Sequence, residues 1–280
     1  MLRVREVECK SLLNKSGLAD YTINCYTGCE HGCRYCYARF MMKFTGHTEE
    51  WGSFVDIKIN GPEVLHRQIK RSKPGSVFVS SVCDGWQPLE KRYQLTRRCI
   101  EILLDHRYPI TILTKSSLIE RDMDLLSKRN VEFGVTITTL NETLRKTFEP
   151  KASPSEERLR VLEIAKRNRI NSYVFLGPLI PYLSDTEEEL SKTMRAIADI
   201  KPDYLYIDRL NSRPMGRVFD WGVWNSLSNT LRQLSYDLIE KYRKILFEPY
   251  WSNGYSEDLR KRVIRVAGRY RLNGKLRFCF

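Results

Sequence analysis

Short apolar runs alternate with longer segments of helical periodicity through the middle of the chain. Runs rich in β-branched and aromatic residues predict strands at 76–82, 109–114, 131–139, 170–176 and 203–210. The segments between them place apolar residues three and four positions apart, which predicts helices at 90–106, 119–129, 155–168 and 186–200, the last with Asp185 as its N-cap. Strands that alternate with helices of this length form βαβ units, so we expect a parallel sheet.

The number of units indicates a βα barrel. We predict an α/β fold of the partial (βα)6-type TIM barrel class over residues 1–210, with the loop at 25–40 after the first strand. In such barrels the reacting groups lie at the carboxyl ends of the strands. After residue 210 the βα alternation stops. We therefore expect a separate helical extension at 211–280 that covers the barrel mouth.

The charge of this extension differs from that of the rest of the chain. Residues 211–280 hold 14 Lys and Arg against 6 Asp and Glu, whereas residues 1–210 hold 33 against 28. From Arg260 to the end there are eight basic residues and no acidic one. A formal net charge of +13 suits an anionic partner, and nucleic acid is the partner we expect. A Lys/Arg/Glu-rich thermophile composition remains an alternative explanation.

The overall composition excludes several classes of protein. With 280 residues, 42% of them hydrophobic and 29% charged, the chain is long enough for a substantial core and is not disordered. No apolar run approaches the roughly 18–20 residues that span a bilayer, and the first ten residues mix charges of both signs. We therefore expect a cytoplasmic protein that does not use a membrane.

Half of the eight cysteines fall within twelve residues. Cys29, Cys33 and Cys36 have the spacing C-x3-C-x2-C, and clustered thiolates are soft ligands for iron–sulfur clusters or zinc. Three thiolates would hold three corners of a [4Fe–4S] cluster and leave one iron open. A structural zinc site needs four ligands, and Cys25 or His31 could supply the fourth. A zinc-stabilised nucleic-acid-binding protein without catalysis therefore remains an alternative.

Several motifs together resemble one enzyme superfamily. They are CEHGCRYCYA around the three cysteines, SSVCDGWQPLE at 80–90, ILTKS at 112–116, VTITTLNETLRKTFEPKASPSEERL at 135–159 and GPLIP at 177–181. This set is similar to the radical S-adenosylmethionine (SAM) superfamily and, within it, to the spore photoproduct lyase-like branch related to DNA repair photolyases. The resemblance covers roughly residues 20–185.

The resemblance implies two cofactors and a set of residues that bind them. Cys29, Cys33 and Cys36 would ligate a [4Fe–4S] cluster, whose open iron would bind SAM. One-electron cleavage of SAM would then give a 5′-deoxyadenosyl radical that abstracts hydrogen from a substrate. The residues implied in SAM binding are Ser81, Cys83, Asp84, Lys115, Thr136, Thr138 and Gly177. Two of them also have structural interpretations: Asp84 could cap the turn before Gly85, and Thr138 could end a strand.

The catalytic assignments rest on a departure from the lyase pattern. The branch has a hydrogen-donor cysteine where this chain has Ser81, whereas Cys83 stands two residues later. Residues 81 and 83 would share one side of a strand, so Cys83 could donate hydrogen from a shifted place, or be a small buried residue. This departure weakens the expectation of direct thymine-dimer repair. Tyr35 and Tyr37 match tyrosines implicated in hydrogen transfer, or pack around the cluster.

The resemblance therefore implies a radical SAM enzyme, either a lyase or a modification enzyme. We expect a nucleic-acid substrate, and an external electron donor of the flavodoxin or ferredoxin type. A radical SAM enzyme that modifies a peptide or protein is the first alternative. The smaller expectations are a structural ion pair or a helix-start contact for Glu149 and Arg158, and a core position for Cys99.

Overall fold

Six parallel strands in chain order form the centre of the molecule. A computed structural model of the chain describes residues 1–128, 130–211 and 221–280, so 212–220, the start of the predicted extension, lie outside the described residues. The main sheet has the order β11-β10-β9-β8-β7-β6-β3-β2, in which every neighbouring pair is parallel except β2 with β3. Its strands are β2 (Asn14–Lys15), β3 (Tyr21–Ile23), β6 (Val77–Val79), β7 (Ile110–Thr114), β8 (Val131–Ile137), β9 (Ser172–Leu179), β10 (Tyr204–Arg209) and β11 (Leu276–Phe278).

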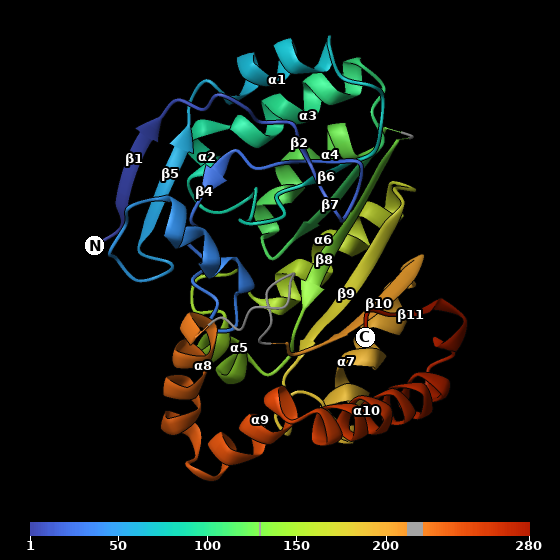
Figure 1. The fold of residues 1–280 in the computed structure, drawn as a ribbon. Coiled ribbons are helices and arrows are strands. Elements are labelled where there is room, and N and C mark those ends of the chain that lie inside the picture. Colours follow the sequence, from blue (N-terminus) through green and yellow to red (C-terminus); the bar gives the residue numbers. More distant parts are fainter. Residues whose placement is uncertain (129, 212–220) are drawn as a thin grey trace.

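The helices follow the strands as the sequence predicts for βα units. Figure 1 shows the curved sheet with α1 and α3 at one end of the row of helices and α7 and α10 at the other. The helices of the βα units are α1 (Gly61–Ile69), α2 (Glu90–Tyr93), α3 (Leu95–Asp105), α4 (Met123–Leu126), α5 (Glu142–Phe148), α6 (Ser155–Arg167) and α7 (Glu187–Ile200). Within the described residues no ladder joins β2 to β11, and the fold is the predicted α/β fold of partial-barrel type.

A small second sheet flanks the barrel. It has the order β1-β5-β4, formed by β1 (Arg3–Val7), β4 (Tyr26–Thr27) and β5 (Phe54–Lys58). Its strands are paired parallel between β1 and β5 and antiparallel between β5 and β4. The segment from β4 to β5 therefore starts and ends on neighbouring strands, and it contains all three cysteines of the motif.

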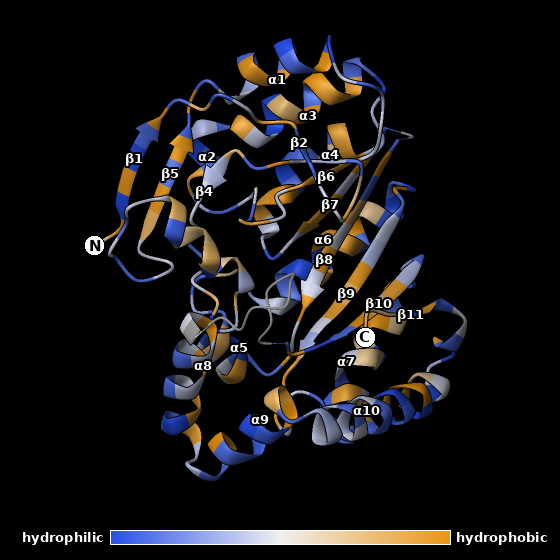
Figure 2. Cartoon of the chain, in the orientation of Figure 1, coloured by the Kyte–Doolittle hydropathy of each residue, from blue (hydrophilic) through white to orange (hydrophobic). Residues whose placement is uncertain are grey.

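The main core lies between the sheet and the helices that follow its strands. Alternate residues of the strands are fully buried against these helices, among them Ile112, Phe133, Val174 and Leu205. In Figure 2 the central strands are largely orange, whereas α10 carries both orange and blue residues. This arrangement agrees with the one-sided burial expected of surface helices. Cys99 on α3 is fully buried in this core, as predicted.

Three local predictions are wrong. The strand predicted at 76–82 ends at Val79, because Ser80 takes a left-handed backbone conformation with φ 66° and turns the chain. The helix predicted at 119–129 is a 3-10 helix, η2 (Ser117–Asp122), followed by one turn of α4. Asp185 does not cap α7, because the side chain of Thr186 accepts the hydrogen bond from the Glu189 amide.

The residues after β10 are integrated with the barrel. They form α8 (Trp221–Leu234), α9 (Asp237–Phe247), α10 (Pro249–Arg269), η3 (Asn273–Lys275) and the edge strand β11. Leu259, Val263 and Val266 of α10 belong to the main core, and α8 and α9 contribute to a second core. The described helices include none that is long and apolar enough to cross a membrane.

Candidate radical SAM site

The three cysteines of the motif lie on one loop that is covered from two sides. Cys29 packs with Ala38, Trp51 and Phe54, whereas Cys33 packs in the second core against residues of α5, α8 and α9. Burial raises the pKa of all three thiols, that of Cys33 to about 12. Among the described residues, no group of three or more His, Cys, Asp or Glu side chains is drawn together tightly enough for a single metal ion.

Glycines allow this loop to pack closely against the strand that follows it. Gly28 has φ 90°, and a Cβ there would lie 2.4 Å from the Phe54 carbonyl oxygen. A Cβ on Gly52 would lie 2.6 Å from the Cα of Gly32. Side chains at these positions would push the loop away from β5. The glycines therefore fix where the three thiols are presented.

The two residues considered as a fourth ligand have other partners. The sulfur of Cys25 lies 3.6 Å from that of Cys99, within the main core. His31 is buried, and its Nδ1 lies 3.4 Å from a carboxylate oxygen of Asp84. Burial lowers the pKa of His31 and outweighs the opposing effect of the Asp84 carboxylate. The donor set on the loop is thus three soft thiols, which fits an iron–sulfur cluster with one open corner.

A buried ion pair ties the cysteine loop to β8. Arg158 donates to Glu149 at 2.6 Å, which confirms the predicted structural ion pair, and both side chains are fully buried. Glu149 also accepts hydrogen bonds from Thr138, at 2.7 Å, and from the hydroxyl of Tyr35. Although burial opposes it, Arg158 with Lys115 lowers the pKa of Glu149 to about 2. Tyr35, placed between two of the cysteines, is therefore held by a charged network rather than by apolar packing alone.

Asp84 joins two strand ends. It accepts hydrogen bonds from the Thr114 hydroxyl at 2.7 Å, from the Lys115 amide at 2.8 Å and from the Trp86 amide at 2.9 Å. The bond to Trp86 closes the turn around Gly85, so the capping interpretation of Asp84 is confirmed. The bonds to Thr114 and Lys115 fix the carboxyl end of β7.

Lys115 and Thr136 lie at neighbouring strand ends and fit a polar cofactor. The ammonium nitrogen of Lys115 lies 5.9 Å from the centre of the Tyr35 ring. Burial lowers its pKa, but Cys33 and Glu149 raise it overall. The hydroxyl oxygen of Thr136 is buried and has no hydrogen-bond partner among the described residues. An orphaned buried hydroxyl is costly unless something binds it, so this position suits a cofactor group.

Gly177 and Thr138 form the next part of the same edge. The hydroxyl oxygen of Thr138, which donates to Glu149, also lies 3.2 Å from the carbonyl oxygen of Gly177. A Cβ on Gly177 would lie 3.0 Å from the Cβ of Asp208, so β9 and β10 approach closely here. Burial raises the pKa of Asp208 to about 6. Asp208 was not predicted; its position at the end of a strand was the available signal.

Ser81 and Cys83 come together at Asn24, although the strand that was expected to align them is absent. The Ser81 hydroxyl accepts from the Asn24 amide nitrogen at 3.1 Å, and the Cys83 sulfur lies 3.6 Å from the Asn24 amide oxygen. Tyr37, which is 38% exposed, donates to the Ser81 carbonyl oxygen. Asn24 is a second residue that sequence reasoning missed. It precedes the cysteine loop and links β3 to the loop after β6.

A pocket of about 470 Å³ borders the cysteine loop at His31. Its lining includes His31, Trp86, Ser116, Lys151 and Arg160. Lys115, Thr136 and Gly177 do not line it. None of the predicted SAM-binding residues is among the residues that line this pocket.

Comparisons with solved structures support the fold. A spore photoproduct lyase variant with bound SAM and dinucleoside spore photoproduct matches over 100% of this chain and 82% of its own, with a TM-score of 0.73 and 14% sequence identity. At this identity the match shows a shared fold.

Sequence comparisons identify the family. An uncharacterized protein of Methanocaldococcus jannaschii is 38% identical over 196 residues, which is 69% of this chain and 73% of that protein. An uncharacterized protein of Mycobacterium bovis is 29% identical over 96% of this chain and 81% of its own length. The model of the radical SAM superfamily matches residues 23–197, which contain the three cysteines and all the predicted SAM-binding residues. The chain belongs to the radical SAM superfamily, whose cofactors are SAM and a [4Fe–4S] cluster.

Proposed function

We propose that this chain is a radical SAM enzyme that abstracts hydrogen from a nucleic-acid substrate, in repair or modification like that of the spore photoproduct lyase branch. When bound, the cluster and SAM supply reductive cleavage of the sulfonium to a 5′-deoxyadenosyl radical. The observation that carries the proposal is a loop of three thiols beside strand ends that present Lys115 and an unpartnered Thr136 hydroxyl. The electron comes from an external donor of the flavodoxin or ferredoxin type.

The residues of the chain have distinct roles in this proposal. Cys29, Cys33 and Cys36 hold the cluster, and α8 and α9 keep water away from Cys33. Lys115 and Thr136 orient the carboxylate end of SAM, while Thr138 and the Gly177 backbone border its adenosine end. Asp84 and Ser81 stabilise the loops around it. Tyr35 positions the cysteine loop through Glu149.

Cys83 is the hydrogen donor we propose for the closing step. Its sulfur lies near Asn24, which also binds Ser81, the position of the donor cysteine in the lyase-like pattern. A thiol at this place would return a hydrogen atom to a substrate radical, and the thiyl radical left on Cys83 would be reduced by one electron from the external donor and a proton from solvent. Tyr37, bonded to the same loop, is the second residue we place on this route.

The nucleic-acid substrate is supported by charge and by fold. The chain carries a formal net charge of +13, which favours anionic partners. The structurally similar lyase was solved with a dinucleoside lesion bound.

The decisive experiment follows the origin of the abstracted hydrogen. The enzyme, reconstituted anaerobically and reduced with dithionite, should cleave SAM to 5′-deoxyadenosine without any substrate. Uniformly deuterated DNA, RNA and protein are then added separately, and the mass of 5′-deoxyadenosine is measured. We expect one deuterium to be transferred from a nucleic acid. Transfer from protein would instead support the peptide-modifying alternative, and colourless protein with one zinc per chain would support a binding protein without catalysis.

A further inference from the structure

Four of the eight basic residues from Arg260 onward form ion pairs with carboxylates of the described residues. On α10, Arg262 pairs with Asp185 at 3.1 Å, and Arg265 pairs with Glu187 at 2.7 Å. Arg269 pairs with the same glutamate. These pairs fasten α10 to the start of α7. Part of the predicted basic patch from Arg260 onward therefore attaches α10 to the start of α7.

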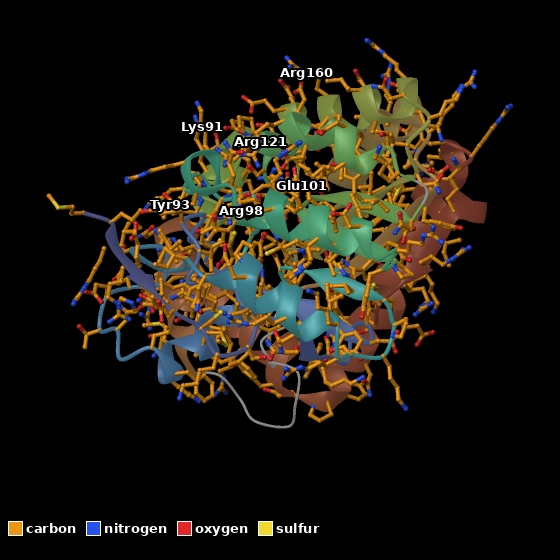
Figure 3. All side chains as sticks on the ribbon, turned by 90° about the horizontal axis from the view of Figure 1, so that it is seen from above. Lys91, Tyr93, Arg98, Glu101, Arg121 and Arg160 are labelled. Atoms are coloured by element: carbon orange, nitrogen blue, oxygen red, sulfur yellow. The ribbon has the colours of Figure 1, made fainter. Side chains whose placement is uncertain are left out.

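Arginines on a second basic surface, over α3, η2 and α6, also form ion pairs with carboxylates. Figure 3 labels Arg98, Arg121 and Arg160 on this face. Arg98 lies 2.8 Å from Glu63, Arg121 lies 2.8 Å from Asp122, and Arg160 lies 3.2 Å from Glu120. Each guanidinium has a carboxylate beside it, so the local field on this face is close to balanced.

A row of aromatic and lysine side chains differs from these two basic surfaces. It is formed by Tyr182, by α9 and by the start of α10. The Lys241 nitrogen lies 5.6 Å from the centre of the Tyr182 ring, and that of Lys244 lies 5.5 Å from the Trp251 ring. The rings of Trp251 and Tyr250 pack edge to face, with their centres 5.8 Å apart. Among the described residues neither lysine forms an ion pair with a carboxylate. We call these five residues the aromatic–lysine row.

The rings of this row are open to solvent. Tyr182 is 48% exposed, Trp251 50% and Tyr250 84%. Large aromatic side chains are usually buried, because each removes 150–250 Å² of surface from water. Exposed rings beside lysines that pair with no carboxylate of the described residues form a surface on which flat apolar rings and negative groups can both bind. Nucleic acid combines these two features, since bases stack and phosphates carry charge.

The row begins beside the strand ends of the candidate site. Tyr182 lies three residues after the end of β9, and the hydroxyl of Tyr242 on α9 donates to the Pro181 carbonyl oxygen. Arg209, the last residue of β10, donates to the hydroxyl of Ser252 at 3.0 Å, one residue after Trp251. Figure 1 shows α9 beyond the ends of β9 and β10. A strand on this row would therefore lead toward the edge that holds Gly177 and Thr136.

We propose that the aromatic–lysine row binds a single-stranded segment of nucleic acid and guides it to the strand ends. Bases stack on Tyr182, Tyr250 and Trp251, and Lys241 and Lys244 contact phosphates. A single strand fits better than a duplex, because paired bases cannot present their faces to these rings. The inference rests on the proposed function, since it names the surface by which a nucleic-acid substrate approaches the same site.

The test measures binding directly, without SAM or reductant. A fluorescein-labelled single-stranded 12-mer, as DNA and as RNA, is titrated with reconstituted protein and followed by anisotropy at several salt concentrations. The plot of log association constant against log salt concentration has a negative slope. The double variant Lys241→Gln with Lys244→Gln should make this slope less steep by about 1.4, since each phosphate contact on a single strand contributes about 0.7. Trp251→Leu should weaken binding roughly 5- to 150-fold, the range for one stacked base, with little change in slope.

Matched controls distinguish binding by the aromatic–lysine row from a general effect of positive charge on the protein. Lys261→Gln with Arg265→Gln removes two positive charges from α10, where both pair with glutamates, and should leave affinity and slope nearly unchanged. Trp251→Phe keeps a stacking ring and should recover most of the affinity. Each variant must also retain the wild-type melting temperature and SAM cleavage without substrate, which shows that the fold and the site are intact.

Three outcomes would overturn the inference. The first is wild-type protein that cleaves SAM but binds no single strand, in which case the radical SAM assignment stands and the row has another role. The second is equal loss of affinity in the α10 control. The third is competition by duplex DNA as strong as by the single strand, which would exclude stacking on the row.

Discussion

Arg158 and Glu149 lie 2.6 Å apart with both side chains fully buried, and this pair holds the cysteine loop through Tyr35. Glu149→Gln keeps the volume of the side chain but leaves the guanidinium without a counter-charge. We expect the free energy of unfolding to fall by about 3–5 kcal/mol, because an uncompensated buried charge is costly. Urea unfolding measures the loss.

The same substitution at an exposed pair provides the control. Glu120 faces Arg160 at the surface, so Glu120→Gln should cost about 0–1 kcal/mol. In the Glu149→Gln background, Arg158→Met should recover part of the stability, since it removes the unpaired charge. Equal effects of the two glutamine substitutions would show that burial of the Glu149 pair is unimportant.

Cluster binding should depend on three cysteines and no others. Cys29→Ser, Cys33→Ser and Cys36→Ser should each lose the brown colour and most of the roughly four irons per chain after anaerobic reconstitution. Cys9→Ser, outside the loop, should keep both. Iron analysis and visible absorption measure the outcome. A comparable loss in Cys25→Ser, with the protein still folded, would make Cys25 a fourth ligand and remove the open corner.

Asp208 should make stability depend on pH in a characteristic direction. Burial raises its pKa from 3.8 to about 6, so between these values the folded state holds a proton that the unfolded state has released. The stability linked to this proton is therefore fully present below about pH 4 and is lost as the pH rises through 6. Relative to wild type, Asp208→Asn should gain up to about 3 kcal/mol at pH 8 and little at pH 4. Urea unfolding across this range checks it, and a difference independent of pH would contradict it.

Gly177→Ala should disturb the strand edge at which we place SAM. Its Cβ would lie 2.9 Å from the Phe175 ring and 3.1 Å from the Asp208 carbonyl oxygen, so the two strands must separate. We expect a loss of about 1–3 kcal/mol in stability, together with weaker SAM binding in equilibrium dialysis. Gly254→Ala on α10 meets no atom within 4 Å and should not weaken SAM binding. Unchanged SAM affinity in Gly177→Ala would exclude this edge as the binding position.

Cys83→Ala should alter the products more than the cleavage of SAM. A thiol hydrogen exchanges with solvent, so the wild-type enzyme in D₂O should place deuterium in the product, and the variant should not. Formation of 5′-deoxyadenosine without substrate should change little. Cys279→Ala removes an exposed thiol elsewhere and serves as the control. Deuterium in the product of Cys83→Ala would exclude this thiol as the donor.

The sequence predicted the helices, the strands and the motif residues better than it predicted the contacts between side chains far apart in the chain. Hydrophobic patterning located β8 and β9, because the period of apolar residues reports which face of an element is buried. It could not place Asn24 beside Ser81, since that contact depends on the register of β3 against β6 and on the left-handed turn at Ser80. Local periodicity contains no information about such pairings across 57 residues.

The same limit applies to the charges of the predicted basic extension. Arg265 and Glu187 are 78 residues apart, and their pairing follows from the packing of α10 on α7. Counting charges along the sequence identified the excess of Lys and Arg correctly. The count could not distinguish lysines that face solvent, such as Lys241, from arginines that pair with carboxylates, such as Arg265.

The packing of α8 and α9 over Cys33 and Tyr35 has a consequence for biosynthesis. During translation the cysteine loop leaves the ribosome long before Leu227, Leu231, Tyr242 and Leu246, which form part of its cover. Until residues 221–247 have been made, that cover is missing and the nascent thiols are more open to oxidants and to competing metals. Correct metal loading is therefore tied to synthesis of α8 and α9, which follow the cysteine loop by almost two hundred residues.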